Sequence, residues 1–133
     1  MAHRGGVGFD GKTGDGSGLL FDINEDFYRK IINSELSIAL PEEFAIGSFF
    51  AKKNLKDKLQ GDLKKIFRSE NLKIICFRNV PTDSSVLGEE AKDTLPEIFQ
   101  VFLEQKDNTS DQSMQASLFQ ALKTIENKYS NCE

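Results

Sequence analysis

Apolar residues recur along the chain at spacings of three and four, which is the pattern of one buried helix face. The clearest case predicts a helix over about 54–68, carried by Leu55, Leu59, Leu63, Ile66 and Phe67. A second predicts a last helix over 114–129, carried by Met114, Leu118, Leu122, Ile125 and Tyr129. Acidic residues followed by basic ones predict a short helix over 25–32. The candidate N-cap residues are Asn24 or Asp22 for the short helix and Ser110 or Asp111 for the last one.

Short apolar runs of strand length lie between these helices. Residues 72–77 form the clearest run, 44–51 and 98–102 give two more, and 18–21 predicts a buried strand near the start. A loop is expected over 81–96, which begins and ends with proline. The predicted order is strand, helix, strand, helix, strand, strand, helix. This order indicates a mixed, layered α+β fold with one core.

Glycines are concentrated at the start of the chain: seven of the ten lie in the first twenty residues and predict an unusual loop. Residues 6–13 fit the phosphate-binding pattern G-x-x-x-x-G-K-T. That pattern cradles phosphate only between a strand and a helix, whereas residues 14–18 are poor helix formers. A P-loop nucleotide binder is therefore the unfavoured alternative, and nucleotide binding that is lost in Lys12→Ala would support it.

The same glycine-rich residues support a second interpretation. His3-Arg4-Gly5-Gly6-Val7-Gly8 and the segment 10–18 resemble the HRGA-G-D-KTGDGAG block of the class II glutamine amidotransferase domain of glutamate synthases. Further segments resemble blocks of that domain in the same order. They are 44–50, 71–83, Leu87-Gly88 and Ala91 together with 96–102, and 118–126. Five colinear blocks cover nearly the whole chain, which makes the resemblance specific.

The resemblance implies both a fold and a site. The fold is α+β, a partial four-layer α/β/β/α sandwich of the N-terminal-nucleophile type, with 1–133 as a class II domain truncated at both ends. In this family the His-Arg-Gly turn lies beside the catalytic cysteine. The supporting active-site loop is therefore expected to comprise His3, Arg4, Gly5, Asp15, Gly16 and Gly18. A guanidinium such as that of Arg4 is suited to binding a carboxylate or a carbonyl.

The family's nucleophile is a cysteine at residue 1 of the mature chain, whose own α-amino group is the base. Residue 1 is Met here, and Cys76 and Cys132 are expected to be reduced thiols without that base. No catalytic residue is expected in this chain, so the isolated chain is expected to be an inactive fragment. The alternative is a non-catalytic regulatory or binding module derived from the same domain.

Two further charged positions are candidates for a structural contact rather than a site. Arg78 and Asp83 flank Val80-Pro81, and their opposite charges predict a salt-linked corner after the strand over 72–77. His3 is the only histidine, and without the resemblance it would be read as a solvated terminal residue.

The composition and charge of the chain indicate which classes of binding partner to expect. The net charge is −4 with acids and bases interspersed, so no nucleic acid partner is expected. No apolar run approaches the roughly 18 residues of a membrane helix, so no membrane partner is expected. The resemblance implies glutamine as the ligand of the complete domain, with the remainder of glutamate synthase or self-association as the protein contact. The resemblance also implies that the FMN and the iron–sulfur cluster of the parent enzyme lie outside this segment, so no cofactor or metal is expected here. It further implies a location in the cytoplasm or, in a eukaryote, in a plastid.

Overall fold

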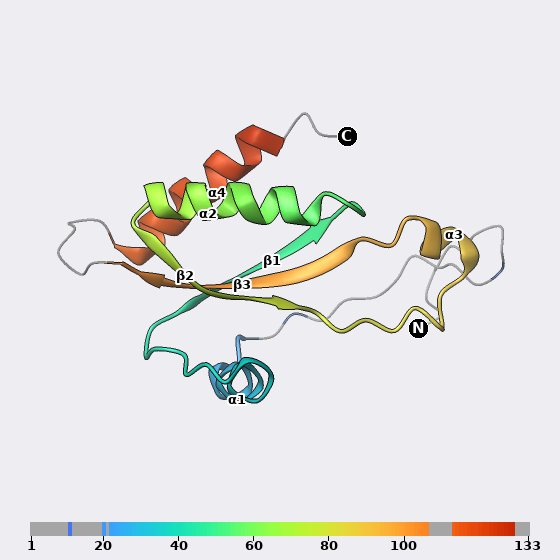
Figure 1. Cartoon of the computed structure of the whole chain (residues 1–133), viewed down its shortest axis with the longest axis horizontal. Helices are drawn as coiled ribbons and strands as arrows, with labels where there is room; N and C mark the ends of the chain where they lie inside the picture. Colours follow the sequence, from blue (N-terminus) through green and yellow to red (C-terminus); the bar gives the residue numbers. More distant parts are fainter. Residues whose placement is uncertain (1–10, 12–19, 21, 107–112, 130–133) are drawn as a thin grey trace.

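A computed structural model describes residues 11, 20, 22–106 and 113–129 of the chain. The elements are α1 (Glu25–Leu36), β1 (Ala45–Ala51), α2 (Lys56–Ser69), β2 (Leu72–Asn79), α3 (Glu89–Asp93), β3 (Glu97–Gln105) and α4 (Met114–Tyr129). The strands form one three-stranded sheet in the order β1-β3-β2 (Figure 1). The predicted α+β fold class is thereby confirmed.

The central strand is β3, and it pairs antiparallel with both neighbours. Its pairing with β1 aligns Ala45 with Leu103 and Ala51 with Glu97. Its pairing with β2 shifts register between Ile74 and Cys76, which is a β-bulge. Since β3 has a strand on each side and helices over both faces, five consecutive residues of it are buried.

Helices cover the two faces of the sheet unequally. Helices α2 and α4 lie on one face, whereas α1 lies on the other (Figure 1). The larger core, between the sheet and the α2–α4 layer, includes Leu63, Phe67, Phe99 and Val101. The smaller core, under α1, centres on Ile32, Leu40 and Phe102. The described residues thus supply one sheet and its helix layer, and they contain no second sheet of a four-layer sandwich.

The predicted starts of α1 and α2 are confirmed. The Asn24 side-chain oxygen accepts a hydrogen bond from the backbone N–H of Phe27 at 2.9 Å, so Asn24 is the N-cap of α1. Helix α1 runs beyond the predicted end at residue 32, and it ends at Ser37, whose φ of 56° is left-handed. Helix α2 begins directly after Leu55 and buries the predicted Leu63, Ile66 and Phe67.

Three sequence-based expectations are wrong. Leu20, expected in a buried strand, is fully exposed and not in a strand; residues 18, 19 and 21 lie outside the described residues. The predicted loop over 81–96 contains the short helix α3. On α4 the buried positions are Ser117 and Ala121, whereas Leu122 is 49% exposed. Small side chains let α4 approach the sheet, and this packing overrides the apolar pattern.

The start of α4 also differs from the expected cap. The Ser113 hydroxyl accepts a hydrogen bond from the backbone N–H of Ala116 at 3.3 Å, immediately before the helix. Ser110 and Asp111, the two expected caps, lie outside the described residues. None of the helices in the described part of the chain is long and apolar enough to span a membrane.

Candidate functional site

The predicted active-site loop lies outside the part of the chain that the structure describes. This holds for His3, Arg4, Gly5, Asp15, Gly16 and Gly18. Within the glycine-rich segment only Gly11 is described, and its φ of 68° is a backbone conformation that L side chains rarely adopt. The described residues therefore show what flanks that loop in the sequence, and the roles of the loop residues stay predictions.

A buried arginine joins α1 to the sheet. Arg78 on β2 is only 7% exposed and donates two hydrogen bonds to the Glu35 carboxylate, from Nε at 2.7 Å and from Nη2 at 2.9 Å. Its Nη1 donates to Oε1 of Gln100 on β3 at 3.1 Å. The Gln100 amide nitrogen in turn donates to the Tyr28 hydroxyl at 3.4 Å. The network links α1, β2 and β3 around one buried cation.

This network corrects the predicted Arg78–Asp83 corner. The Asp83 carboxylate accepts from the backbone N–H of Ser85 at 2.9 Å instead, in a local turn. Sequence reasoning missed Glu35 because the first helix was expected to end at residue 32. Extending the helical period by one turn from Tyr28 and Ile32 would have placed a carboxylate on the face that packs against the sheet.

The electrostatics of this network follow from its geometry. Hydrogen bonding from Arg78 lowers the pKa of Glu35 below its ordinary value, and attraction between the opposite charges acts in the same direction. The same hydrogen bonds raise the pKa of Arg78 against the opposing effect of burial. Both groups therefore stay charged at neutral pH, which makes the pair a structural tie rather than a proton donor or acceptor.

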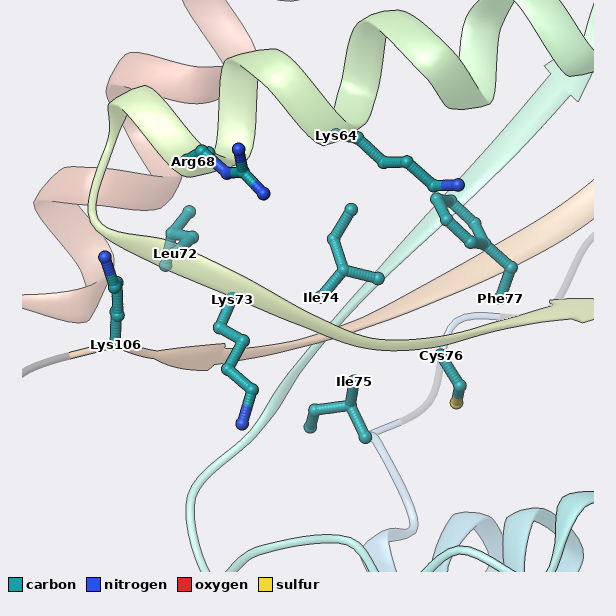
Figure 2. A pocket seen from close by; sticks show the side chains of 9 residues that line it. All are labelled: Lys64, Arg68, Leu72, Lys73, Ile74, Ile75, Cys76, Phe77 and Lys106. Atoms are coloured by element: carbon teal, nitrogen blue, oxygen red, sulfur yellow. The ribbon is translucent and has the colours of Figure 1, made fainter.

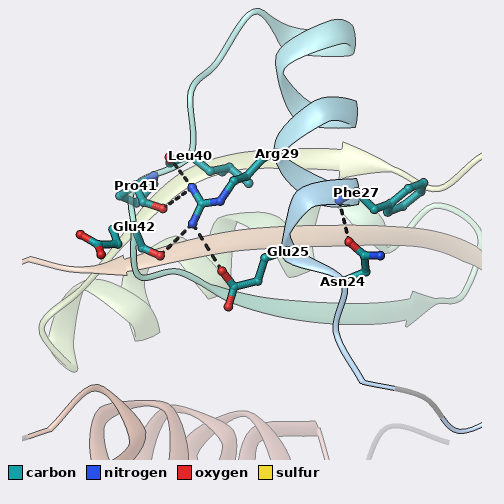
Figure 3. A network of polar contacts seen from close by, with 7 residues as sticks. All are labelled: Asn24, Glu25, Phe27, Arg29, Leu40, Pro41 and Glu42. Atoms are coloured by element: carbon teal, nitrogen blue, oxygen red, sulfur yellow. Dashed lines mark hydrogen bonds and ion pairs between the residues drawn. The ribbon is translucent and has the colours of Figure 1, made fainter.

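A second arginine holds the turn that leads into β1 (Figure 3). Nη1 of Arg29 on α1 donates to the backbone carbonyls of Leu40 at 2.9 Å and Pro41 at 2.7 Å, and Nη2 donates to that of Glu42 at 2.8 Å. The guanidinium also lies 5.0 Å from the centre of the Phe44 ring. One side chain thus satisfies three carbonyls and fixes where β1 begins.

A cationic groove of about 620 Å³ runs along β2. Lys64 and Arg68 extend over it from α2, while Leu72, Ile74 and Phe77 point toward that helix (Figure 2). Lys73 and Lys106 add positive charge, although Lys73 is paired with Glu104 at 2.7 Å. Such a groove attracts anions weakly, because its charges are exposed and screened by salt.

The groove also contains the only cysteine among the described residues. Cys76 is a free thiol on the opposite face of β2 from Phe77 (Figure 2). Burial raises the pKa of the Cys76 thiol, which lowers the fraction of reactive thiolate. The one histidine of the chain, His3, is not among the described residues. The described residues thus hold no cysteine–histidine pair for nucleophilic catalysis.

Metal ions and iron–sulfur clusters are bound by several donor side chains that lie close together. Across residues 11, 20, 22–106 and 113–129, no three His, Cys, Asp or Glu side chains gather as metal ligands. The whole sequence has two cysteines, whereas an iron–sulfur cluster is typically held by about four thiolates. The donor set therefore does not fit the iron–sulfur cluster that the resemblance assigns to the parent enzyme.

Comparison with known proteins identifies the family. The model of class-II glutamine amidotransferases matches residues 1–133. Glutamate synthase [NADH] of Saccharomyces cerevisiae is 40% identical over 111 residues, covering 77% of this chain and 5% of the yeast protein. The chloroplastic ferredoxin-dependent glutamate synthase of Oryza sativa subsp. japonica is 34% identical over 131 residues, or 95% of this chain and 8% of the relative.

A bacterial relative extends the same match. The glutamate synthase [NADPH] large chain of Bacillus subtilis is 30% identical over 130 residues, covering 96% of this chain and 8% of its own length. The chain thus spans less than a tenth of the length of these relatives. Since the family model covers every residue, the chain belongs to the class-II glutamine amidotransferase family.

Proposed function

We propose that this chain forms part of the glutamine-hydrolysing domain of a glutamate synthase. In the complete enzyme that domain would convert glutamine to glutamate and ammonia, and the ammonia would serve to form glutamate from 2-oxoglutarate. The observation that carries the proposal is the family match over residues 1–133, with relatives that are named glutamate synthases.

The proposal gives two parts of the chain different roles. The loop residues His3, Arg4 and Gly5, with Asp15, Gly16 and Gly18, would support the catalytic centre next to the family's catalytic cysteine. The sheet and its helices would form the scaffold, held together by the Arg29 and Arg78 networks. The parent's FMN and iron–sulfur cluster would be bound by other parts of the enzyme.

The isolated chain is proposed to have no glutaminase activity. The mechanism needs a thiol and a free amine on one N-terminal residue, and residue 1 is Met. Cys76 cannot replace that group, because burial raises its pKa and its backbone amine is within a peptide bond. The remainder of a glutamate synthase is the proposed protein partner, in the cytoplasm, or in a plastid as the name of the rice relative indicates for that protein.

A chimera tests the proposal. Residues 1–133 would replace the matching segment of the Bacillus subtilis glutamate synthase large chain, to which they are 30% identical. We expect glutamate formation with glutamine as the nitrogen donor to persist. Glutamate formation with added ammonia serves as the control, since it does not require glutamine hydrolysis. A chimera that uses ammonia but not glutamine would contradict the proposal.

The same chimera tests the expected role of Arg4. Replacing Arg4 by Ala should lower glutamine-dependent activity roughly ten- to hundredfold, since it removes one charge-assisted contact of about 1.5–3 kcal/mol. Ammonia-dependent activity should not change. Lys12→Ala in the neighbouring part of the loop is the matched control, because that lysine is not among the residues expected to support the active site. An equal loss in both variants would argue against a specific role for Arg4.

A further inference from the structure

Within the part of the chain that the structure describes, β2 and β1 are the two outer strands of the sheet, and they differ in how readily an added strand could pair with them. The edge strand β2 has a β-bulge between Ile74 and Cys76 and carries Lys73, which is 63% exposed. Bulges and lysines are features with which proteins block strand pairing at an edge. The opposite edge strand, β1, is Ala-Ile-Gly-Ser-Phe-Phe-Ala, with neither a charge nor a proline. Its Phe50 side chain is 68% exposed.

Charges flank β1 in an asymmetric way. Glu42 and Glu43 precede the strand, and Lys52 and Lys53 follow it. All four residues are exposed, and none of their side chains has an ion-pair partner among the described residues. The strand is therefore an uncharged segment with an acidic start and a basic end. An antiparallel copy of the same segment is complementary to it in charge.

We propose that β1 pairs antiparallel with β1 of a second copy of this chain, across a two-fold axis at Ser48. This register opposes Ala45 to Ala51 and Ile46 to Phe50 of the other copy, so all seven strand residues pair. It also brings Glu43 near Lys53 of the second copy, and by symmetry the reverse. Parallel pairing in register would instead place like charges together, which is unfavourable.

Side-chain size fits the same register. Gly47 would oppose Phe49 of the second copy, and the Phe49 ring of each copy already packs over Gly47 of its own strand. The exposed Phe50 would lie beside Ile46, and an aromatic residue next to a β-branched one is a favourable cross-strand pair. Pairing would join two three-stranded sheets into one continuous sheet of an isologous dimer. The inference is independent of the proposed glutaminase role, because it rests only on the β1 edge.

Charge reversal and charge exchange test the interface in the 133-residue chain. Sedimentation equilibrium should show a dimer for the unmodified chain at micromolar to sub-millimolar concentrations. Glu43→Lys and Lys53→Glu should each raise the dimer dissociation constant about tenfold, because each creates two like-charged pairs. The double variant Glu43→Lys/Lys53→Glu should restore the dimer, since the pairs are then opposite again.

Two further variants test the proposed register of the β1–β1 pair and the choice of β1 as the paired strand. Ser48→Asp should also weaken the dimer, because the two aspartates would face each other across the axis. Lys106→Glu, directly after the central strand β3, is the charge-reversal control and should leave the dissociation constant unchanged. A monomeric unmodified chain, a double variant as weak as the single ones, or an effect of Lys106→Glu equal to that of Lys53→Glu would overturn the proposal.

Discussion

Individual residues in this chain matter most where a buried charge needs a partner. Arg78 is almost completely buried, while the Glu35 side chain that pairs with it is 37% exposed. The two ends of this ion pair are therefore not equivalent. Losing the exposed partner leaves a buried cation without its carboxylate, whereas losing the buried partner leaves a carboxylate that water can solvate.

The unequal burial of Arg78 and Glu35 predicts which of two variants is the less stable. Glu35→Ala should lower the melting temperature more than Arg78→Leu, because leucine fills part of the buried space and leaves no unpaired charge inside. Thermal unfolding monitored by circular dichroism would measure both variants. Equal melting temperatures for the two variants, or a larger loss for Arg78→Leu, would show that the buried guanidinium does not depend on Glu35.

Gly47 offers a test of packing at a single position. A Cβ at residue 47 would lie 3.0 Å from the Phe49 ring and 3.1 Å from a Val101 methyl group. Gly47→Val should therefore destabilise the fold by about 1–3 kcal/mol, as overpacked cores do.

Gly61 is the matched control for Gly47. A Cβ at Gly61, inside α2, meets no atom within 4 Å. Gly61→Ala should raise stability by roughly 0.5–1 kcal/mol through helix propensity. Urea denaturation measures both free energies of unfolding. A Gly47→Val variant as stable as the unmodified chain would mean that the Phe49 ring can move aside.

At the scale of secondary structure, the sequence predicts the helices and strands whose apolar residues follow a strong local pattern. The helix over 54–68 and the strands over 44–51 and 72–77 correspond to α2, β1 and β2. The prediction of which residues of α4 are buried was partly wrong. The buried residues are the small Ser117 and Ala121, where the helix lies closest to its neighbours. The spacing of large apolar residues does not predict contacts that are made by small residues.

The candidate site was less predictable than the fold. The Arg78–Glu35 pair joins residues 43 positions apart, so neither local spacing nor composition indicates it. The loop residues were assigned through resemblance alone. The family match supports that resemblance as a whole, but the individual roles of His3, Arg4 and Asp15 stay predictions.

The contact between α2 and α4 predicts a pH dependence. Asp62 on α2 accepts a hydrogen bond from the Tyr129 hydroxyl at 2.7 Å and pairs with Lys128 at 2.9 Å. These contacts, the tyrosine bond first, lower the pKa of Asp62 below its ordinary value of 3.8. A lowered folded-state pKa means that the stabilisation is complete above about pH 3.8 and is lost as the pH falls through the folded-state value.

Hydrogen exchange would measure this effect. On acidification below pH 4, amide protection in α4 should fall before protection in β3, because the Asp62 contacts tie the end of α4 to α2. Asp62→Asn should reduce α4 protection at neutral pH and make it less sensitive to acid. Unchanged protection of α4 in Asp62→Asn would contradict this role of the carboxylate.

At the scale of the whole molecule, the family assignment and the chemistry of the described residues lead to separate predictions. The match to class-II glutamine amidotransferases covers residues 1–133. The described part of the chain provides a sheet, its covering helices and two arginine networks, and its one cysteine has a raised pKa. For this chain, membership of the family and the capacity to hydrolyse glutamine are therefore separate properties. Losing even one oxyanion donor costs such enzymes about 10²–10³ in rate, and losing the nucleophile removes the covalent route.

The central claim is tested most directly by incubating the purified 133-residue chain with glutamine and, separately, with a glutamine-analogue electrophile. We expect neither ammonia release nor covalent labelling detected by mass spectrometry, because neither Cys76 nor Cys132 is an N-terminal thiol with a free amine. The contradicting result would be ammonia release that is abolished by Cys76→Ser or Cys132→Ser, since this would place a competent nucleophile within the chain.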